Sequence, residues 1–146
     1  MIAEPVTVTE PVSVGDVIVA GGGSLTVKGV GEPGFQLSGN LWVLDGAAEF
    51  TDSVIQVMSA YHGQYAVATA GHSTLTIARC DYRVPTGVQH GLVPAENSRI
   101  EVRDSDFQFV QFVAVQNGTL VAERLNGMFE CVLLDDARLE LADIPR

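Results

Sequence analysis

The stretch Ser98-Arg99-Ile100-Glu101-Val102-Arg103-Asp104-Ser105-Asp106-Phe107 contains the pattern that decides the fold of this chain. Ile100 and Val102 alternate with charged residues, as expected for a strand that buries one face. The pair Asn97-Ser98, typical of a turn, comes directly before the strand. The same arrangement recurs along the chain, and the first apolar residue of each copy, called here the anchor, is Leu25, Ala48, Leu75, Ile100, Leu120 or Leu139. The chain is therefore a series of repeats, and each repeat contains one such strand with the turn that precedes it.

Further columns accompany the anchors. A second apolar residue follows each anchor by two positions, in the set Val27, Phe50, Ile77, Val102, Ala122 and Leu141. Two more apolar columns precede the anchors, Ile18, Leu41, Ala68, Val93, Val113 and Val132, then Ala20, Val43, Ala70, Ala95, Val115 and Leu134. Corners rich in Gly, Asn and Asp follow these columns, and the row Asp45, His72, Asn97, Asn117 and Asp136 is expected to stabilise turns. Such repeats are typical of a solenoid whose coils stack their cores.

The repeats predict an all-β fold, a right-handed, single-stranded parallel β-helix of about six coils over residues 17–146. Each coil is expected to contain three strands. The unequal coil lengths favour this solenoid over the left-handed type, which keeps a strict hexapeptide rhythm. Residues 1–16 alternate cleanly but lack the full repeat, so they are expected to form an N-terminal strand or cap. The final coil is expected to be left uncovered, which favours pairing with another chain.

Composition excludes several classes of function. The net charge of −10 argues against a non-specific binder of nucleic acid or of an anionic membrane, because both reward basic residues. No apolar run approaches the roughly 20 residues of a membrane-spanning helix, and no signal peptide is apparent, although the compartment stays open. Cys80 is expected to be a buried thiol without a disulfide to Cys131, and no metal or cofactor is predicted.

Two loops form the candidate ligand-binding site. The coils that begin at Ala48 and Leu75 carry insertions that the next two coils lack, and these contain aromatic, imidazole and amide side chains: Tyr61, His62, Gln64, Tyr65, Gln89 and His90. Adjacent coils lie about 4.8 Å apart, so both loops should project from the same side. Such a surface suits a saccharide or another small ligand. The alternative is that the tyrosines pack over the loop while the histidines are only solvated.

A column of alternating charge lies four residues after the anchors: Asp52, Arg79, Asp104, Arg124 and Asp143. We expect a structural ladder in which each charge lies between two opposite ones and a shifted register is penalised. The alternative function is contact with an acidic sugar through Arg79 and Arg124. A further hypothesis concerns Glu49 and Glu101, two coils apart on the outward face, at a spacing near that of inverting glycosidases.

The corner, anchor and small-residue columns, with the stretch 98–107, resemble the pectin-lyase-like right-handed β-helix superfamily over roughly residues 17–144. The superfamily includes polysaccharide lyases and hydrolases, phage tailspikes and surface adhesins, so the resemblance implies a fold more than an activity. Asp135-Asp136 and Gln89-His90-Gly91 are similar to hydrolase elements, but their chain order and coil positions differ. No catalytic residue is therefore transferred from the family.

These observations favour a non-catalytic module that self-assembles, as a trimer or end to end, and binds a ligand of the carbohydrate class. The first alternative is a minimal polysaccharide lyase or glycoside hydrolase, which would use the loops with His62 and His90 or the outward glutamates. The second alternative is a purely structural spacer. The sequence leaves these three open.

Overall fold

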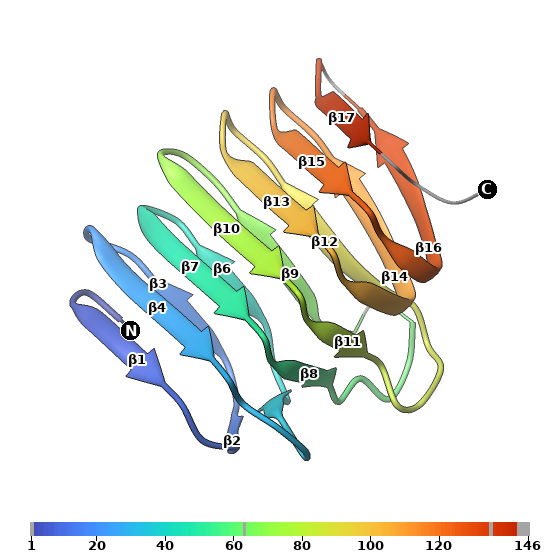
Figure 1. Cartoon of the computed structure of the whole chain (residues 1–146). Helices are drawn as coiled ribbons and strands as arrows, with labels where there is room; N and C mark the ends of the chain where they lie inside the picture. Colours follow the sequence, from blue (N-terminus) through green and yellow to red (C-terminus); the bar gives the residue numbers. More distant parts are fainter. Residues whose placement is uncertain (1, 63, 135, 143–146) are drawn as a thin grey trace.

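The computed structural model describes residues 2–62, 64–134 and 136–142. Across these residues the chain is all-β, with parallel strands stacked as a β-solenoid of about six turns and no helix (Figure 1). The described part therefore also contains no helix long and apolar enough to cross a membrane.

The first sheet takes one strand from each coil and faces the viewer in Figure 1. Its strands, in spatial order, are β1 (Pro5–Val8), β4 (Gly23–Lys28), β7 (Gly46–Thr51), β10 (Ser73–Ala78), β13 (Arg99–Arg103), β15 (Thr119–Glu123) and β17 (Arg138–Ala142). Each anchor pairs with the anchor of the next coil, from Leu25 to Leu139. The predicted anchor ladder and the column two residues after it are confirmed.

The opposite wall is divided in the first coils and continuous in the last ones. One limb contains β2 (Val12–Val14), β5 (Phe35–Leu37), β8 (Val54–Val57) and β11 (Asp81–Arg83), and the other contains β3 (Val17–Val19), β6 (Leu41–Val43), β9 (Ala66–Thr69) and β12 (His90–Pro94). Both limbs pair with the long strand β14 (Asp106–Ala114), which also pairs with β16 (Asn126–Leu133). The expectation of three strands in every coil is thus wrong for the last two coils, because they lack the loop that separates the limbs.

The two apolar columns before the anchors are shifted by one residue from the prediction. In the coils of β12 and β14, Leu92 and Phe112 are fully buried, whereas the predicted Val93 and Val113 are only half-buried. Only in the coil of Leu41 and Val43 are both predicted residues the buried ones. The corners explain the shift, because most of them contain left-handed residues, two in a row at Glu96-Asn97 and Gln116-Asn117. These residues interrupt the alternation, so the parity of one strand cannot be carried through the corner to the next.

The corners themselves lie where the sequence predicts them. Asn97 and Asn117 adopt φ of 67° and 64°, a conformation that asparagine tolerates better than most residues. At Gly46 and Gly118 a Cβ atom would come within 2.3 Å and 2.1 Å of the carbonyl oxygen of a residue one coil earlier. Glycine is therefore required there for the coils to stack closely.

The core is a continuous apolar column with an aromatic chain in its later coils. Phe107 packs against Tyr82 and Phe112 at centroid distances of 5.2 and 5.3 Å. Cys80 is buried, and burial raises the pKa of its thiol to about 11. Both Cys80 and Cys131 are free thiols. Buried serines follow the first-sheet strands: the hydroxyl of Ser105 accepts a hydrogen bond from the Cys80 backbone N–H at 3.1 Å. This bond joins adjacent coils inside the core.

The segment that precedes the full repeat is also built into the stack. Strand β1 pairs with β4, so that Val6 faces Leu25 and Val8 faces Val27, and β2 pairs with β5. The side chains of β1 are mostly exposed because β1 is the edge strand of the first sheet in the described part of the chain. The alternating N-terminal residues thus form strands of the first coil.

Candidate functional site

Two loops lie side by side at the lower right of Figure 1, where residues 58–65 join β8 to β9 and residues 84–89 join β11 to β12. The Thr86 hydroxyl donates a hydrogen bond to the Ser59 carbonyl oxygen at 2.5 Å. The backbone N–H of Gln89 donates to Nδ1 of His62 at 2.9 Å. The loops therefore occupy adjacent coils on one side of the molecule, as their similar offsets from the anchors predict.

His90 points into the core, which corrects its assignment to the ligand-binding surface. Its side chain is buried, with Nδ1 2.8 Å from the Tyr65 carbonyl oxygen and Nε2 2.6 Å from the Tyr82 hydroxyl. A carbonyl oxygen can only accept, so Nδ1 carries the proton and Nε2 accepts from Tyr82. Burial lowers the pKa of His90 to about 4 and raises the pKa of Tyr82, which keeps both groups neutral. His90 thus ties the first loop to the core and offers no free nitrogen to a ligand.

The remaining predicted loop residues differ in their exposure. The Gln64 side-chain oxygen accepts a hydrogen bond from the Ala60 N–H, so it closes its own loop. Tyr65 is half-buried and packs against the core, whereas Tyr61 is 63% exposed. His62 is exposed at the edge of a hollow that Tyr65 also lines. This part of the site therefore offers one imidazole and two tyrosine rings to solvent.

Two adjoining hollows beside these loops form the candidate site, called here the loop-side groove. One has a volume of about 400 Å³ and is lined by His62, Tyr65, Gln89 and Gln111, among others. The second has a volume of about 300 Å³ and is lined by Gln89, Phe109, Phe129 and Glu130 with Gly127 and Val110. Gln89 belongs to both hollows. The groove thus combines aromatic rings with amides and one carboxylate.

Glu130 occupies the polar centre of the loop-side groove. Gln111 on β14 pairs directly with Glu130 on β16. The side-chain amides of Gln111 and Gln89 donate to the same carboxylate oxygen, Oε1, at 3.0 and 3.2 Å. The other oxygen, Oε2, receives no hydrogen bond from a described residue. The carboxylate is therefore held in position while one of its oxygens stays available.

Phe109 reaches the groove through an irregularity in β14. The pairing of β14 with β16 skips one residue between Gln108 and Val110, and Phe109 adopts φ of 58°. This left-handed conformation is a genuine outlier for a bulky residue, and such bulges redirect side chains next to functional sites. A Cβ atom placed on Gly87 would lie 3.8 Å from the ring of Phe109. The bulge therefore places the half-buried ring of Phe109, which also packs against the core, next to the second loop.

Basic residues are kept away from the loop-side groove. Neither hollow is lined by Lys or Arg. Of the described basic residues, six lie on the first sheet or at the bend after it: Lys28, Arg79, Arg99, Arg103, Arg124 and Arg138. The seventh, Arg83 on β11, is bound to Asp81 and Glu32. The two walls of the solenoid thus differ in charge.

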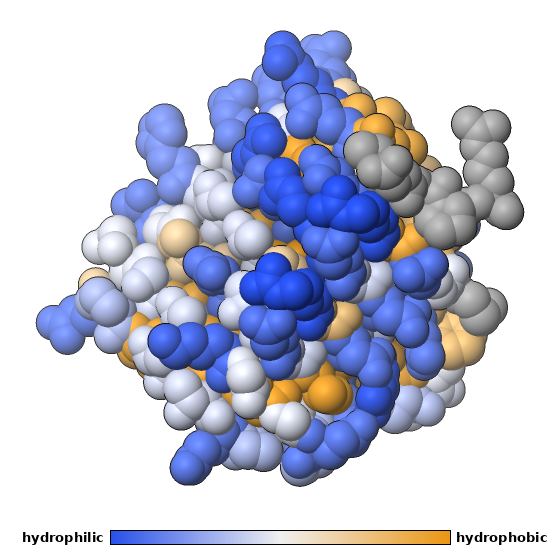
Figure 2. Space-filling model, in the orientation of Figure 1, coloured by the Kyte–Doolittle hydropathy of each residue, from blue (hydrophilic) through white to orange (hydrophobic). Residues whose placement is uncertain are grey.

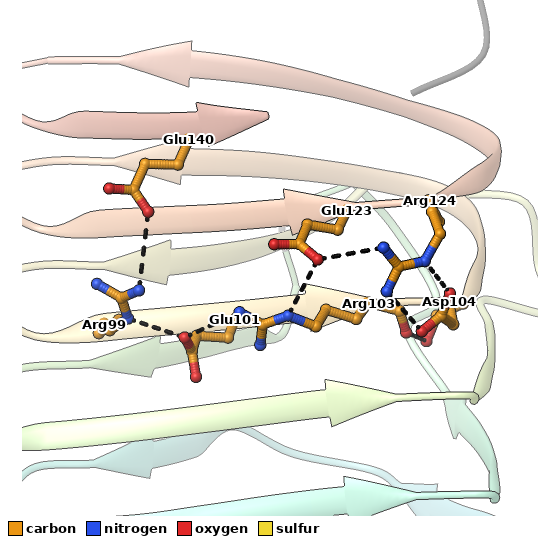
Figure 3. Close-up of polar contacts among 8 residues, drawn as sticks. Arg99, Glu101, Arg103, Asp104, Glu123, Arg124 and Glu140 are labelled. Atoms are coloured by element: carbon orange, nitrogen blue, oxygen red, sulfur yellow. Dashed lines mark hydrogen bonds and ion pairs between the residues drawn. The ribbon is translucent and has the colours of Figure 1, made fainter. Parts of the chain in front are cut away.

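The outward face of the first sheet carries an ionic network that spans three strands (Figure 3). Arg103 lies 3.3 Å from Glu101 on its own strand and 3.4 Å from Glu123 on β15, while Arg99 lies 3.7 Å from Glu140 on β17. Partial burial alone would raise the pKa of Glu101, but hydrogen bonds from Arg103 and Arg99 outweigh it and lower that pKa. The most hydrophilic residues of this view gather over the same strands in Figure 2. Glu101 is thus a paired carboxylate, which is a poor candidate for a general acid.

The charge column at the corner contains two bidentate Arg–Asp pairs, and Arg124 also lies 3.3 Å from Glu123. Arg79 contacts both oxygens of Asp52, at 2.8 and 3.2 Å, and Arg124 contacts both oxygens of Asp104. These hydrogen bonds lower the pKa values of Asp52 and Asp104. Each of the four residues lies at a left-handed bend that ends a first-sheet strand. Asp143, the last residue predicted for this ladder, lies outside the described residues.

Successive pairs of the column interact more weakly with each other. Asp104 acts on Arg79 only through space, as a minor contribution to the raised pKa of Arg79. A hollow of about 600 Å³ runs along the bend and is lined by Asp52, Arg79 and Asp104 together with small residues. Because Arg79 and Arg124 are each held by a carboxylate, they are poorly placed to receive an acidic sugar.

No group of three or more His, Cys, Asp or Glu side chains within residues 2–62, 64–134 and 136–142 is arranged to hold a metal ion. Scans against protein-family models, curated proteins and solved structures find no match to this chain. The pectin-lyase-like resemblance therefore rests on the coil pattern, and the parallel β-solenoid is what the structure establishes.

Four groove residues were missed by sequence reasoning: Phe109, Gln111, Phe129 and Glu130. Outward polar residues on a strand are ordinary, so Gln111 and Glu130 carried no signal by themselves. A test of alternation along β14 could have found Phe109, because Phe107 and Phe109 occupy inward parity while Val110 and Phe112 occupy the opposite parity. That change of parity inside one strand is the sequence mark of a bulge.

Proposed function

We propose that this chain is a non-catalytic β-solenoid module that binds a carbohydrate in the loop-side groove. One observation carries the proposal: Phe109 and Phe129 line an open hollow next to the hydrogen-bonded row of Gln89, Glu130 and Gln111. Sugar rings present C–H faces that pack on aromatic rings and hydroxyls that require fixed polar partners. Mostly apolar walls with a few placed polar groups are typical of small-ligand sites.

The test is a calorimetric titration with a panel of neutral, acidic and amino oligosaccharides. We expect binding of at least one class, and we expect it to weaken at least about tenfold in Gln111→Ala, because an amide then no longer positions Glu130. Arg99→Ala on the opposite sheet serves as the matched control and should bind like the unmodified chain. Absence of binding across the panel, with no effect when the loops are shortened, would support the purely structural spacer.

The finer family assignment is also a proposal. A pectin-lyase-like solenoid is supported by the divided wall and by the asparagine corners at Asn97 and Asn117. Within that superfamily the enzymatic alternative is less favoured, because Glu101 is bound to two arginines and His90 is buried. Turnover of an acidic polysaccharide that disappears in a His62→Ala/Glu130→Gln double variant would favour the enzyme instead.

Self-association is a second proposal, supported by exposed leucines on the last described coil. Leu133, Leu134 and Leu141 are 45%, 50% and 53% exposed, whereas Ala114 and Ala122, the equivalents of Leu133 and Leu141 one coil earlier, are fully buried. Two such ends placed together would bury these side chains. Light scattering on a sizing column would show a dimer or trimer, whereas a monomer at all concentrations would contradict self-association.

A further inference from the structure

We infer that the ligand of the loop-side groove carries a positive charge, and that its class is an oligosaccharide of unacetylated amino sugars whose ammonium group binds Glu130. This inference rests on the proposed function and makes its substrate class specific. It concerns the charge of the ligand, which the aromatic rings and amides alone leave open.

The first argument is the hydrogen bonding of Glu130. Both glutamine amides donate to Oε1, at 3.0 and 3.2 Å, and Oε2 receives no donor from a described residue. An ionised carboxylate is an acceptor only, with room for about four hydrogen bonds. The ligand atom that faces Oε2 must therefore be a donor. An ammonium group supplies three donors and a charge, and its hydrogen bond is stronger than that of a neutral hydroxyl.

The second argument is the absence of a counter-charge. Several carboxylates of the described residues, namely Asp52, Asp104 and Glu101, are paired with arginine. Glu130 has only neutral amides around it, and the hollows that it and Gln89 line contain no Lys or Arg. A cationic ligand would supply the missing partner, whereas an acidic sugar would meet repulsion from Glu130 and from a chain of net charge −10.

The third argument is the position of the aromatic rings. Phe109 and Phe129 pack in part against the core and line the same hollow as Glu130 with the part of each side chain that stays accessible. Aromatic faces attract cations within about 6 Å of the ring centre, so rings beside a carboxylate favour an ammonium over a neutral group. Phe109 is directed there by a left-handed residue at a β-bulge. The same rings can pack against the C–H face of the sugar that bears the ammonium.

The test compares β-1,4-linked glucosamine hexamer with its fully N-acetylated counterpart, by calorimetry on the full chain at low ionic strength. We expect the glucosamine hexamer to bind at least about tenfold more tightly, because a hydrogen bond between two charged groups is stronger than one to a neutral group. Glu130→Gln, which keeps the shape and removes the charge, should abolish this preference. Added salt should also reduce it.

The matched control is Glu140→Gln on the first sheet, which changes the net charge by the same amount. It should keep the full preference, and this separates a local contact from general attraction of a polycation to an acidic protein. Equal affinity for both hexamers, or an equal loss of preference in Glu130→Gln and Glu140→Gln, would overturn the inference and leave saccharide binding intact. Failure to bind any neutral, acidic or amino oligosaccharide would overturn the proposed function as well.

Discussion

On the first sheet, Arg103 is held by carboxylates from its own strand and the next one, whereas in the loop-side groove Glu130 meets only glutamine amides. The two walls belong to the same coils and share one core, so their difference lies in the outward side chains. A face whose charges satisfy one another contributes to the register of the strands and keeps few groups for a ligand. On the groove side, a positioned carboxylate without an ionic partner is the feature on which the proposed binding depends.

The largest expected effect concerns His90, which supports the groove from the core side. In the unfolded chain its pKa is near 6.5, and in the folded chain burial lowers this to about 4. Between these values the unfolded state binds a proton that the folded state does not, so stability falls as the pH drops from 6.5 to 4. At about 1.4 kcal/mol per pKa unit, the loss is about 3 kcal/mol.

This loss is measured from urea unfolding at a series of pH values, for the unmodified chain and for His90→Gln. Carboxylates titrate in both proteins, so the difference between the two profiles isolates the histidine. We expect the profile of the variant to be flatter between pH 6.5 and 4. Parallel profiles would mean that His90 is not held as a buried, neutral group.

The second prediction tests whether the ring of Phe109, which is held by a left-handed backbone conformation, takes part in binding. Phe109→Gly removes the ring and lets glycine adopt φ of 58° without strain, which for other residues costs about 1–2 kcal/mol. We expect affinity for the bound oligosaccharide to fall at least about tenfold, with a smaller loss of stability than in Phe129→Gly, where no strain is relieved. Calorimetry and thermal unfolding measure the two effects. A variant that loses stability but binds normally would show that the ring only fills space.

The smallest expected effect is on the first sheet. Arg103→Ala removes two partly buried ion pairs at the surface, which should lower the free energy of unfolding by no more than about 1 kcal/mol, and less at high salt. Saccharide binding should be unchanged, because Arg103 lies on the opposite wall from the groove. Denaturant unfolding at two salt concentrations checks the first statement and titration checks the second. A clear loss of affinity would mean that the ionic face also takes part in binding.

The stacked coils were predictable because their signal is periodic. From Leu25 to Ala122 the anchors and the residues two positions later are buried on one sheet. Asn97 and Asn117 suit a left-handed conformation, and Gly118 is required by the close approach of the preceding coil. In the strands that lead into each corner, the sequence did not predict which residues face the core, since residues 112–115, for example, are apolar at every position. Two left-handed residues at a corner then decide which half of them faces the core.

The candidate site, too, was predictable from the sequence only in part. From the sequence, two insertions at similar offsets indicated neighbouring loops, and the Asp and Arg residues after the anchors indicated a charge column at the bend. Only the tertiary structure decided that His90 is buried against Tyr82, that a bulge at Phe109 places its ring next to the second loop, and that amides from two other coils meet Glu130 on one oxygen. The physical reason is the range of the interactions: turns and strand alternation depend on neighbours in the chain, whereas the groove depends on lateral contacts between coils about 20 to 40 residues apart.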